Sequence, residues 1–464
     1  MLRSSCVVTS ALALLSFTVL AQNLRSSPTQ TLTQDSNDWP MYNHDVLGTR
    51  FNPAETTLTR DSVRRLKIKW IFPTKGDVYA TPSVVNGIVY AGDTSGRFYA
   101  LTSLGKRLWE TKVNGPITDS ALVTDQMVIF GDQAGFIYGL ERNKGKLVWS
   151  NQPNSDGSSA IFSSPILANG QVIVGISSFE TPSKLSTFRG SVVSLDPNTG
   201  RQIWQKYLIE GSGSGAGVWS TPTYDATTDT VYVTTANNHS PPATDTSDAF
   251  VALKGQDGTI VWKNQRVPND IGDIKADIGD SPQVYTIFSG GKTRRVIGAG
   301  EKQTGEYWVL DAATGDLVGS IQAVPSCEGS EGLFADSAIN ENDGVVFVNG
   351  VNCKVPSHPP FLPPTGAVIA LKSDASKKLW EFTSFVAPVL SGVAVANGVV
   401  YFNASGLFSI LYALDAETGR VLGGVLTSGG ISGPAVSHGQ IYLGTGTKFA
   451  SGIATPTGIV AIGL

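Results

Sequence analysis

A short motif that recurs eight times along the chain constrains the fold more than any other feature of the sequence. In each copy a β-rich segment ends in a small residue or valine followed by Leu or Ile, and the copies are 39 to 61 residues apart. The eight pairs are Ala100-Leu101, Gly139-Leu140, Ser194-Leu195, Ala252-Leu253, Val309-Leu310, Ala370-Leu371, Ala413-Leu414 and Ala461-Ile462. Periods of this length are typical of repeat architectures rather than of unrelated domains.

A turn and the pattern Gly-x-x-x-Trp follow most copies of this motif. The pattern runs from Gly105 to Trp109, Gly145 to Trp149, Gly200 to Trp204 and Gly258 to Trp262, with Ser376 to Trp380 as a variant. Two further copies keep the glycine but carry Gly319 and Gly423 where the others have tryptophan. Short strands also precede each Leu or Ile, so every unit is predicted to contain four strands, which is the composition of a propeller blade.

The two ends of the chain indicate how the predicted propeller closes. The eighth unit ends at Leu464 after its third strand, while residues 66–72 have the pattern of a fourth strand with its own Trp70. Pairing these two segments would remove the last open sheet edges. We therefore predict an all-β, eight-bladed propeller of four-stranded blades over residues 38–464, in which an N-terminal strand completes the C-terminal blade.

Composition and charge agree with an exported β-protein. Gly and Pro account for 51 and 24 of the 464 residues, which favours many strands joined by tight turns, and the net charge of −4 provides no basic surface for nucleic acid. Residues 1–21 have the layout of a secretory signal, with an apolar run too short to span a membrane, and residues 22–37 are expected to be a flexible segment. In an oxidising compartment Cys327 and Cys353 are expected to form a disulfide, although two free thiols are the alternative.

Polar side chains occupy equivalent positions in three successive units. Glu180, Asn237 and Lys302 each follow the second predicted strand of a unit, and Trp219 stands where the fourth unit begins. The segment 270–280 between units is rich in aspartate. In a propeller these loops lie on one face, so a carboxylate and an amide could ligate a hard cation there, an aspartate could accept a proton, and the indole could stack on a planar cofactor. The four histidines lie in different units without metal-ligand spacing, and we interpret them as surface or packing residues.

At these residues the sequence resembles the pyrroloquinoline-quinone (PQQ) alcohol dehydrogenases, and most closely their polyvinyl-alcohol-dehydrogenase-like branch. The motifs that carry the resemblance are Asp38-Trp39-Pro40-Met41-Tyr42, Gly48-Thr49-Arg50-Phe51, Phe188-Arg189-Gly190-Ser191-Val192-Val193, Leu-Asp-x-x-Thr-Gly at Leu195, Leu310 and Leu414, and the set Trp219, Asp225 and Asn237. The resemblance implies that Glu180 and Asn237 ligate Ca²⁺, Trp219 lies under the quinone and Lys302 contacts its reactive carbonyl. It also implies a catalytic aspartate in the segment 270–280. Counting forward from residues 268–270 points to Asp273, whereas counting back from residues 281–282 points to Lys275, with Asp277 two residues on, so both aspartates stay open.

The resemblance thus predicts oxidation of a small-molecule or polymeric alcohol with PQQ and Ca²⁺. No fused cytochrome is recognisable, so the electrons are expected to pass to a separate acceptor such as a cytochrome c or a quinone. Two alternatives stay open: a non-catalytic propeller that acts as a secreted protein-interaction scaffold, and a sensor that binds a quinone without turnover.

Overall fold

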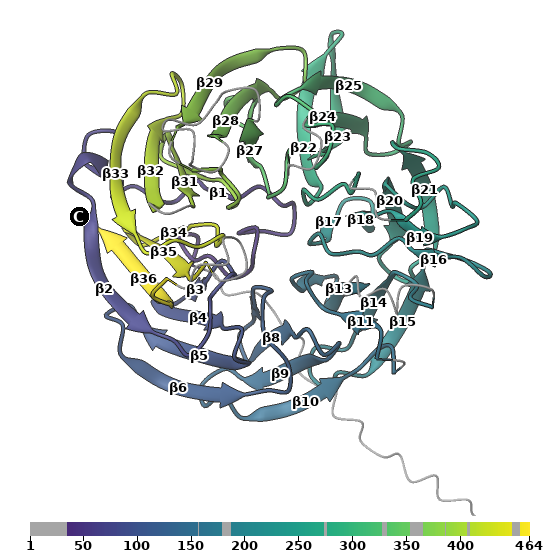
Figure 1. Cartoon of the computed structure of the whole chain (residues 1–464), viewed down its shortest axis with the longest axis horizontal. Helices are drawn as coiled ribbons and strands as arrows, with labels where there is room; N and C mark the ends of the chain where they lie inside the picture. The colour runs from purple at the N-terminus through teal and green to yellow at the C-terminus, as the bar shows by residue number, and fades with distance from the viewer. Residues whose placement is uncertain are drawn as a thin grey trace, which may run out of the picture.

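The structure, a computed structural model, describes residues 35–155, 157–178, 187–272, 276–326, 332–352, 365–385, 387–405, 409–447 and 455–464. The predicted secretory signal and the two cysteines of the predicted disulfide lie outside these residues. Eight sheets are arranged as a ring around a central axis (Figure 1). The prediction of an eight-bladed propeller is therefore confirmed. In the described part of the chain no helix is both long enough and apolar enough to cross a membrane.

Each blade is an antiparallel four-stranded sheet that runs from an inner to an outer strand. Blades 1 to 4 contain β3 (Ser83–Val85), β4 (Ile88–Gly92), β5 (Arg97–Thr102), β6 (Arg107–Lys112); β7 (Leu122–Val123), β8 (Met127–Gly131), β9 (Ile137–Glu141), β10 (Leu147–Asn151); β12 (Ile166–Ala168), β13 (Gln171–Ser178), β14 (Ser191–Leu195), β15 (Gln202–Tyr207); and β17 (Thr223–Asp225), β18 (Thr230–Thr234), β20 (Ala249–Lys254), β21 (Ile260–Gln265). Blades 5 to 7 contain β22 (Gln283–Ser289), β23 (Lys292–Gly300), β24 (Glu306–Asp311), β25 (Leu317–Gln322); β26 (Ala338–Asn340), β27 (Val345–Asn352), β28 (Thr365–Lys372), β29 (Lys378–Ser384); and β30 (Ala394–Ala396), β31 (Val399–Ala404), β32 (Ser409–Asp415), β33 (Val421–Thr427). Short additions are β1 (Phe51–Asn52), which pairs with β30, β11 (Ser159–Ala160), which pairs with β13, the ribbon of β16 (Ser214–Gly215) and β19 (Asn238–Ser240), and the 3₁₀ helix η1 (Val63–Arg65).

Blade 8 is built from both ends of the chain. It contains β34 (Ala435–Ser437), β35 (Gln440–Thr445) and β36 (Gly458–Gly463), and its outermost strand is β2 (Lys67–Pro73). The strand β2 lies antiparallel to β36, with Ile68 opposite Ile462 and Phe72 opposite Ile459. Figure 1 shows the purple N-terminal strand alongside the yellow C-terminal one. The predicted closure is confirmed.

The recurrent tryptophan of a blade packs against a glycine in the outer turn of the following blade. Trp204 on β15 donates its indole N–H to the carbonyl of Gly255 in the outer turn of blade 4, and a Cβ added to Gly258 in that turn would lie 2.6 Å from the indole. Glycine is therefore required both for its φ of +72° and for the space it leaves. The same pairing recurs between Trp70 and Gly105, Trp109 and Gly145, Trp149 and Gly200, Trp262 and Gly315, and Trp380 and Gly419.

The two units that lack this tryptophan use close backbone contacts instead. A Cβ on Gly319 would lie 2.4 Å from the carbonyl oxygen of Asp374 in blade 6. A Cβ on Gly423 would lie 2.6 Å from the carbonyl oxygen of Val63, where η1 packs on blade 7. Glycine replaces tryptophan at these positions because backbone already fills the space between the blades.

The N-terminal segment 39–52 runs along the inner edges of the blades. Its carbonyl oxygens accept hydrogen bonds from the inner strands of blades 1, 2, 4, 5, 6 and 7, and Asn52 donates to the carbonyl of Val436 in blade 8. Unpaired strand edges facing the axis would otherwise leave backbone N–H groups without partners. Arg50, which is fully buried, donates to the carbonyls of Val393 and Pro434 and so joins blades 7 and 8.

Candidate functional site

Trp219 is positioned by the segment that links blades 4 and 5. The residue lies just before β17 and is half-buried. A Cβ built on Gly279 would come within 2.4 Å of the indole, so the backbone of this linking segment packs directly against the ring. Phe334 also packs near it, with ring centroids 5.9 Å apart. The indole is thus held at a fixed place by backbone on one side and an aromatic side chain on another.

Asn237 follows β18, and its side chain is fixed in one orientation. The side-chain N–H₂ group donates to the carbonyl oxygens of Gly272, at 2.5 Å, and Asn238, at 3.1 Å. With both donors engaged by backbone, the amide oxygen is the atom that Asn237 presents to a ligand. The residue is 2% exposed, so that oxygen is held without the mobility of a surface side chain.

Asp277 connects Asn237 to Lys302. Its Oδ1 atom accepts the backbone N–H of Asn237 at 3.2 Å, and its Oδ2 atom is 3.2 Å from the Lys302 ammonium. The Lys302 Nζ atom also lies over the indole of Trp219, 6.0 Å from the ring centroid. Asp277 therefore links the backbone of Asn237 in blade 4 to the side chain of Lys302 in blade 5, and Lys302 lies beside the indole of Trp219.

Further buried carboxyl groups surround Asp277. Burial, together with the nearby charges of Asp277 and Asp270, raises the pKa of Asp248 to about 9. Burial likewise raises the pKa of Asp270 and of Glu301, with Asp277 adding to both effects. At a pKa of about 9 the Asp248 carboxyl group is mostly protonated at pH 7.

The structure brings together most of the described residues that the sequence singled out. Trp219, Asn237, Asp277 and Lys302 form one cluster on the face predicted from strand polarity. Glu180 and Asp273 lie outside the described residues, so their predicted roles stay predictions. Asp280 does not join the cluster, because it is fully buried and accepts hydrogen bonds from the backbone of Gly300 and Ser337.

Sequence reasoning missed two residues of this site. Gly279 lies within the aspartate-rich segment, but its role as the surface on which Trp219 packs has no signal in a single sequence. Asp248 precedes β20, has a φ of +46° and is fully buried. The only signal for Asp248 in the sequence is an aspartate at the beginning of an apolar strand, in Ser-Asp-Ala-Phe-Val.

The chain is similar in sequence and in fold to several known proteins. A family model described as outer membrane protein assembly factor BamB matches residues 49–240, which is less than half of the chain. The chain is 24% identical over 481 residues to a polyvinylalcohol dehydrogenase from Pseudomonas sp., with 88% of this chain and 73% of the relative covered. It is 26% identical to the dehydrogenase subunit of the quinone alcohol dehydrogenase from Gluconacetobacter polyoxogenes, with 61% of this chain and 45% of the relative covered. The chain is a relative of the quinoprotein alcohol dehydrogenases.

This relationship confirms the resemblance inferred from the motifs. The quinohemoprotein alcohol dehydrogenase from Comamonas testosteroni has the same fold, with a TM-score of 0.78 at 20% identity over 92% of this chain and 80% of that one. The chain spans less than half the length of the Gluconacetobacter subunit, although it spans 73% of the polyvinylalcohol dehydrogenase.

Proposed function

We propose that this protein is an exported dehydrogenase that binds PQQ and Ca²⁺ and oxidises an alcohol to an aldehyde or ketone. The observation that carries the proposal is the convergence of Trp219, Asn237, Asp277 and Lys302, which includes a stacking surface, an oriented amide oxygen, a carboxylate and a cation. The named relatives are alcohol dehydrogenases, so the scaffold alternative is not favoured. The signal-like residues 1–21 support export.

The residues present fit a planar quinone and a hard cation. The fixed orientation of Asn237 leaves an amide oxygen as donor, which suits Ca²⁺, and Glu180 would supply a carboxylate to the same ion. Trp219 would provide the surface on which the ring system stacks, and Lys302 would lie at its edge. When bound, PQQ supplies the acceptor for the hydride that leaves the alcohol carbon.

The chain's own side chains would handle the proton and the developing charge. Asp277 would accept the hydroxyl proton of the alcohol as the carbon–hydrogen bond breaks. Lys302 would stabilise negative charge that develops on an oxygen near it, since its ammonium already faces the site. The oxidation releases two electrons and two protons in total, and the electrons would pass to an external acceptor such as a cytochrome c or a quinone.

Reconstitution of the chelator-treated protein tests this function. We expect turnover of at least one alcohol, measured with an artificial dye acceptor, only when PQQ and Ca²⁺ are both added. The screen should include primary and secondary alcohols and polyvinyl alcohol, because one relative is named for that polymer. A protein that folds and binds PQQ but turns over none of them would favour the sensor alternative, and one that does not bind PQQ would favour the scaffold.

A further inference from the structure

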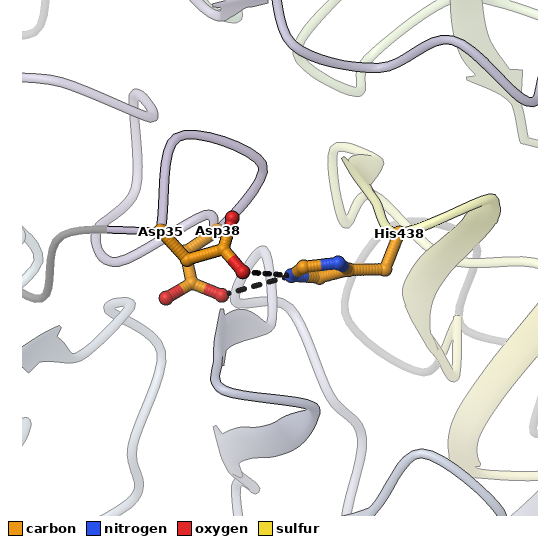
Figure 2. Close-up of side chains that lie close together, drawn as sticks. All are labelled: Asp35, Asp38 and His438. Carbon is orange, nitrogen blue, oxygen red and sulfur yellow. Dashed lines mark hydrogen bonds and ion pairs between the residues drawn. The ribbon is translucent and has the colours of Figure 1, made fainter.

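Three side chains of types that can ligate a metal meet where the N-terminal segment contacts blade 8, in a cluster separate from the one around Trp219. Asp35 and Asp38 precede the segment that lines the inner strands, and His438 lies in the turn between β34 and β35. Figure 2 shows both carboxylates directed at the same imidazole nitrogen. The Nε2 atom of His438 is 3.0 Å from Asp38 Oδ1 and 3.6 Å from Asp35 Oδ2, and the three ligand atoms all lie within 4.8 Å of one another.

These separations suit a small tetrahedral cation. A Zn²⁺ ion with bonds of about 2.0–2.1 Å to nitrogen and oxygen holds its ligand atoms about 3.3–3.4 Å apart. The observed 3.0 and 3.6 Å lie on either side of that value. One imidazole nitrogen with two carboxylates is also a donor set suited to zinc, whereas Ca²⁺ takes six to eight oxygen ligands.

A histidine–aspartate ion pair accounts for only part of this arrangement. A single N–H at Nε2 can be donated to Asp38 at 3.0 Å, but Asp35 at 3.6 Å is beyond ordinary hydrogen-bond distance. A cation between the three atoms would contact the imidazole nitrogen and both carboxylates at once. The second carboxylate, directed at the same nitrogen from a chain position three residues away, is what distinguishes the cluster from an ordinary pair.

The ligands are held in place and can be reached from solvent. The side chain of Asp38 is 1% exposed, and its Oδ1 atom also accepts the backbone N–H of Asn86. The backbone N–H of His438 donates to Asn37 Oδ1, which fixes the turn against the N-terminal segment. The side chains of Asp35 and His438 are 46% and 36% exposed, so an ion can enter and water can complete its coordination.

We propose that Asp35, Asp38 and His438 form a binding site for a divalent transition-metal cation, with Zn²⁺ as the preferred ion. The ion ties residues 35–38 to blade 8, 400 residues further along the chain, and so fastens the segment that lines the inner strands. The turn between first and second strands lies on the face opposite the loops that carry Asn237 and Lys302. The site is therefore structural and independent of the proposed oxidation.

Titration of the chelator-treated full-length chain tests this site. We expect one equivalent of Zn²⁺ to bind in calorimetry, and Co²⁺ to give the visible absorption of a tetrahedral site with nitrogen and oxygen ligands. At Zn²⁺ concentrations of about 100 times Kd, linkage predicts that the midpoint of thermal unfolding rises by about 3 °C for a chain of this size.

Two substitutions and one control decide the outcome. Asp35→Asn and His438→Gln should each abolish the binding of one equivalent of Zn²⁺, the Co²⁺ absorption and the rise in the unfolding midpoint. Asp35 is half-exposed, so its substitution should not impair folding. Asp61→Asn changes an acid whose side chain is 95% exposed beside η1, and it should behave as wild type. Absence of Zn²⁺ binding in the wild type, or binding that survives both substitutions, would overturn the proposal.

Discussion

Asp277→Asn is expected to lower kcat for alcohol oxidation by about 10²–10⁴-fold, the usual contribution of a positioned general base. Asparagine has nearly the same shape as aspartate, and its oxygen can still accept the backbone N–H of Asn237. It cannot take a proton from the substrate, and it loses the ion pair with Lys302. The Kd for PQQ should change by much less than kcat does, and the midpoint of thermal unfolding should stay close to that of the wild type.

Asp273→Asn provides the matched comparison, because Asp273 is the other carboxylate that the sequence offers as the base. The two variants should be assayed side by side with the same alcohol and dye acceptor. Loss of turnover in Asp273→Asn with full activity in Asp277→Asn would reassign the base. Full activity in both variants would eliminate an aspartate of this segment as the base.

Trp204→Ala is expected to lower the free energy of unfolding by about 3–5 kcal/mol, as large-to-small changes of buried aromatic residues do. The substitution removes the indole that packs on Gly258 and the hydrogen bond to the carbonyl of Gly255, and it leaves a cavity between blades 3 and 4. The effect should appear as a lower urea concentration at the midpoint of unfolding, followed by intrinsic fluorescence.

Leu104→Ala serves as the control for this stability measurement. Leu104 is 81% exposed in an outer turn of blade 1, so its removal should change stability by less than about 0.5 kcal/mol. Equal urea midpoints for Trp204→Ala and Leu104→Ala would show that the contact between Trp204 and blade 4 does not stabilise the propeller.

The repeat pattern was sufficient to predict the blades, because each blade is formed from consecutive strands. Closure by β2 was also predictable, since one end of the chain lacked a strand that the other end had in excess. The glycine on which each tryptophan packs could not be predicted from the sequence. Trp204 and Gly200 belong to one sequence motif, yet Trp204 packs on Gly258 of the following blade, and spacing within a motif does not contain that contact.

The candidate site was predictable only where blade positions are equivalent. Asn237 and Lys302 follow the second strand of neighbouring blades, which is why their convergence could be inferred. Asp277 and Asp273 could not be separated, because counting from the two ends of the linking segment gives different positions. His438 and Asp38 are 400 residues apart in sequence and share no period, so only the closed ring shows that they meet.

The most direct test of the proposed function is an equilibrium titration of the protein with PQQ, followed by tryptophan quenching, with and without Ca²⁺. The measurement does not depend on knowing the substrate. We predict saturable quenching with a Kd below about 10 μM, which corresponds to about 7 kcal/mol, that requires Ca²⁺ and is lost in Asn237→Ala. Absence of saturable binding, or binding that is unchanged by Ca²⁺ removal and by Asn237→Ala, would contradict a quinone and calcium site at Trp219 and Asn237.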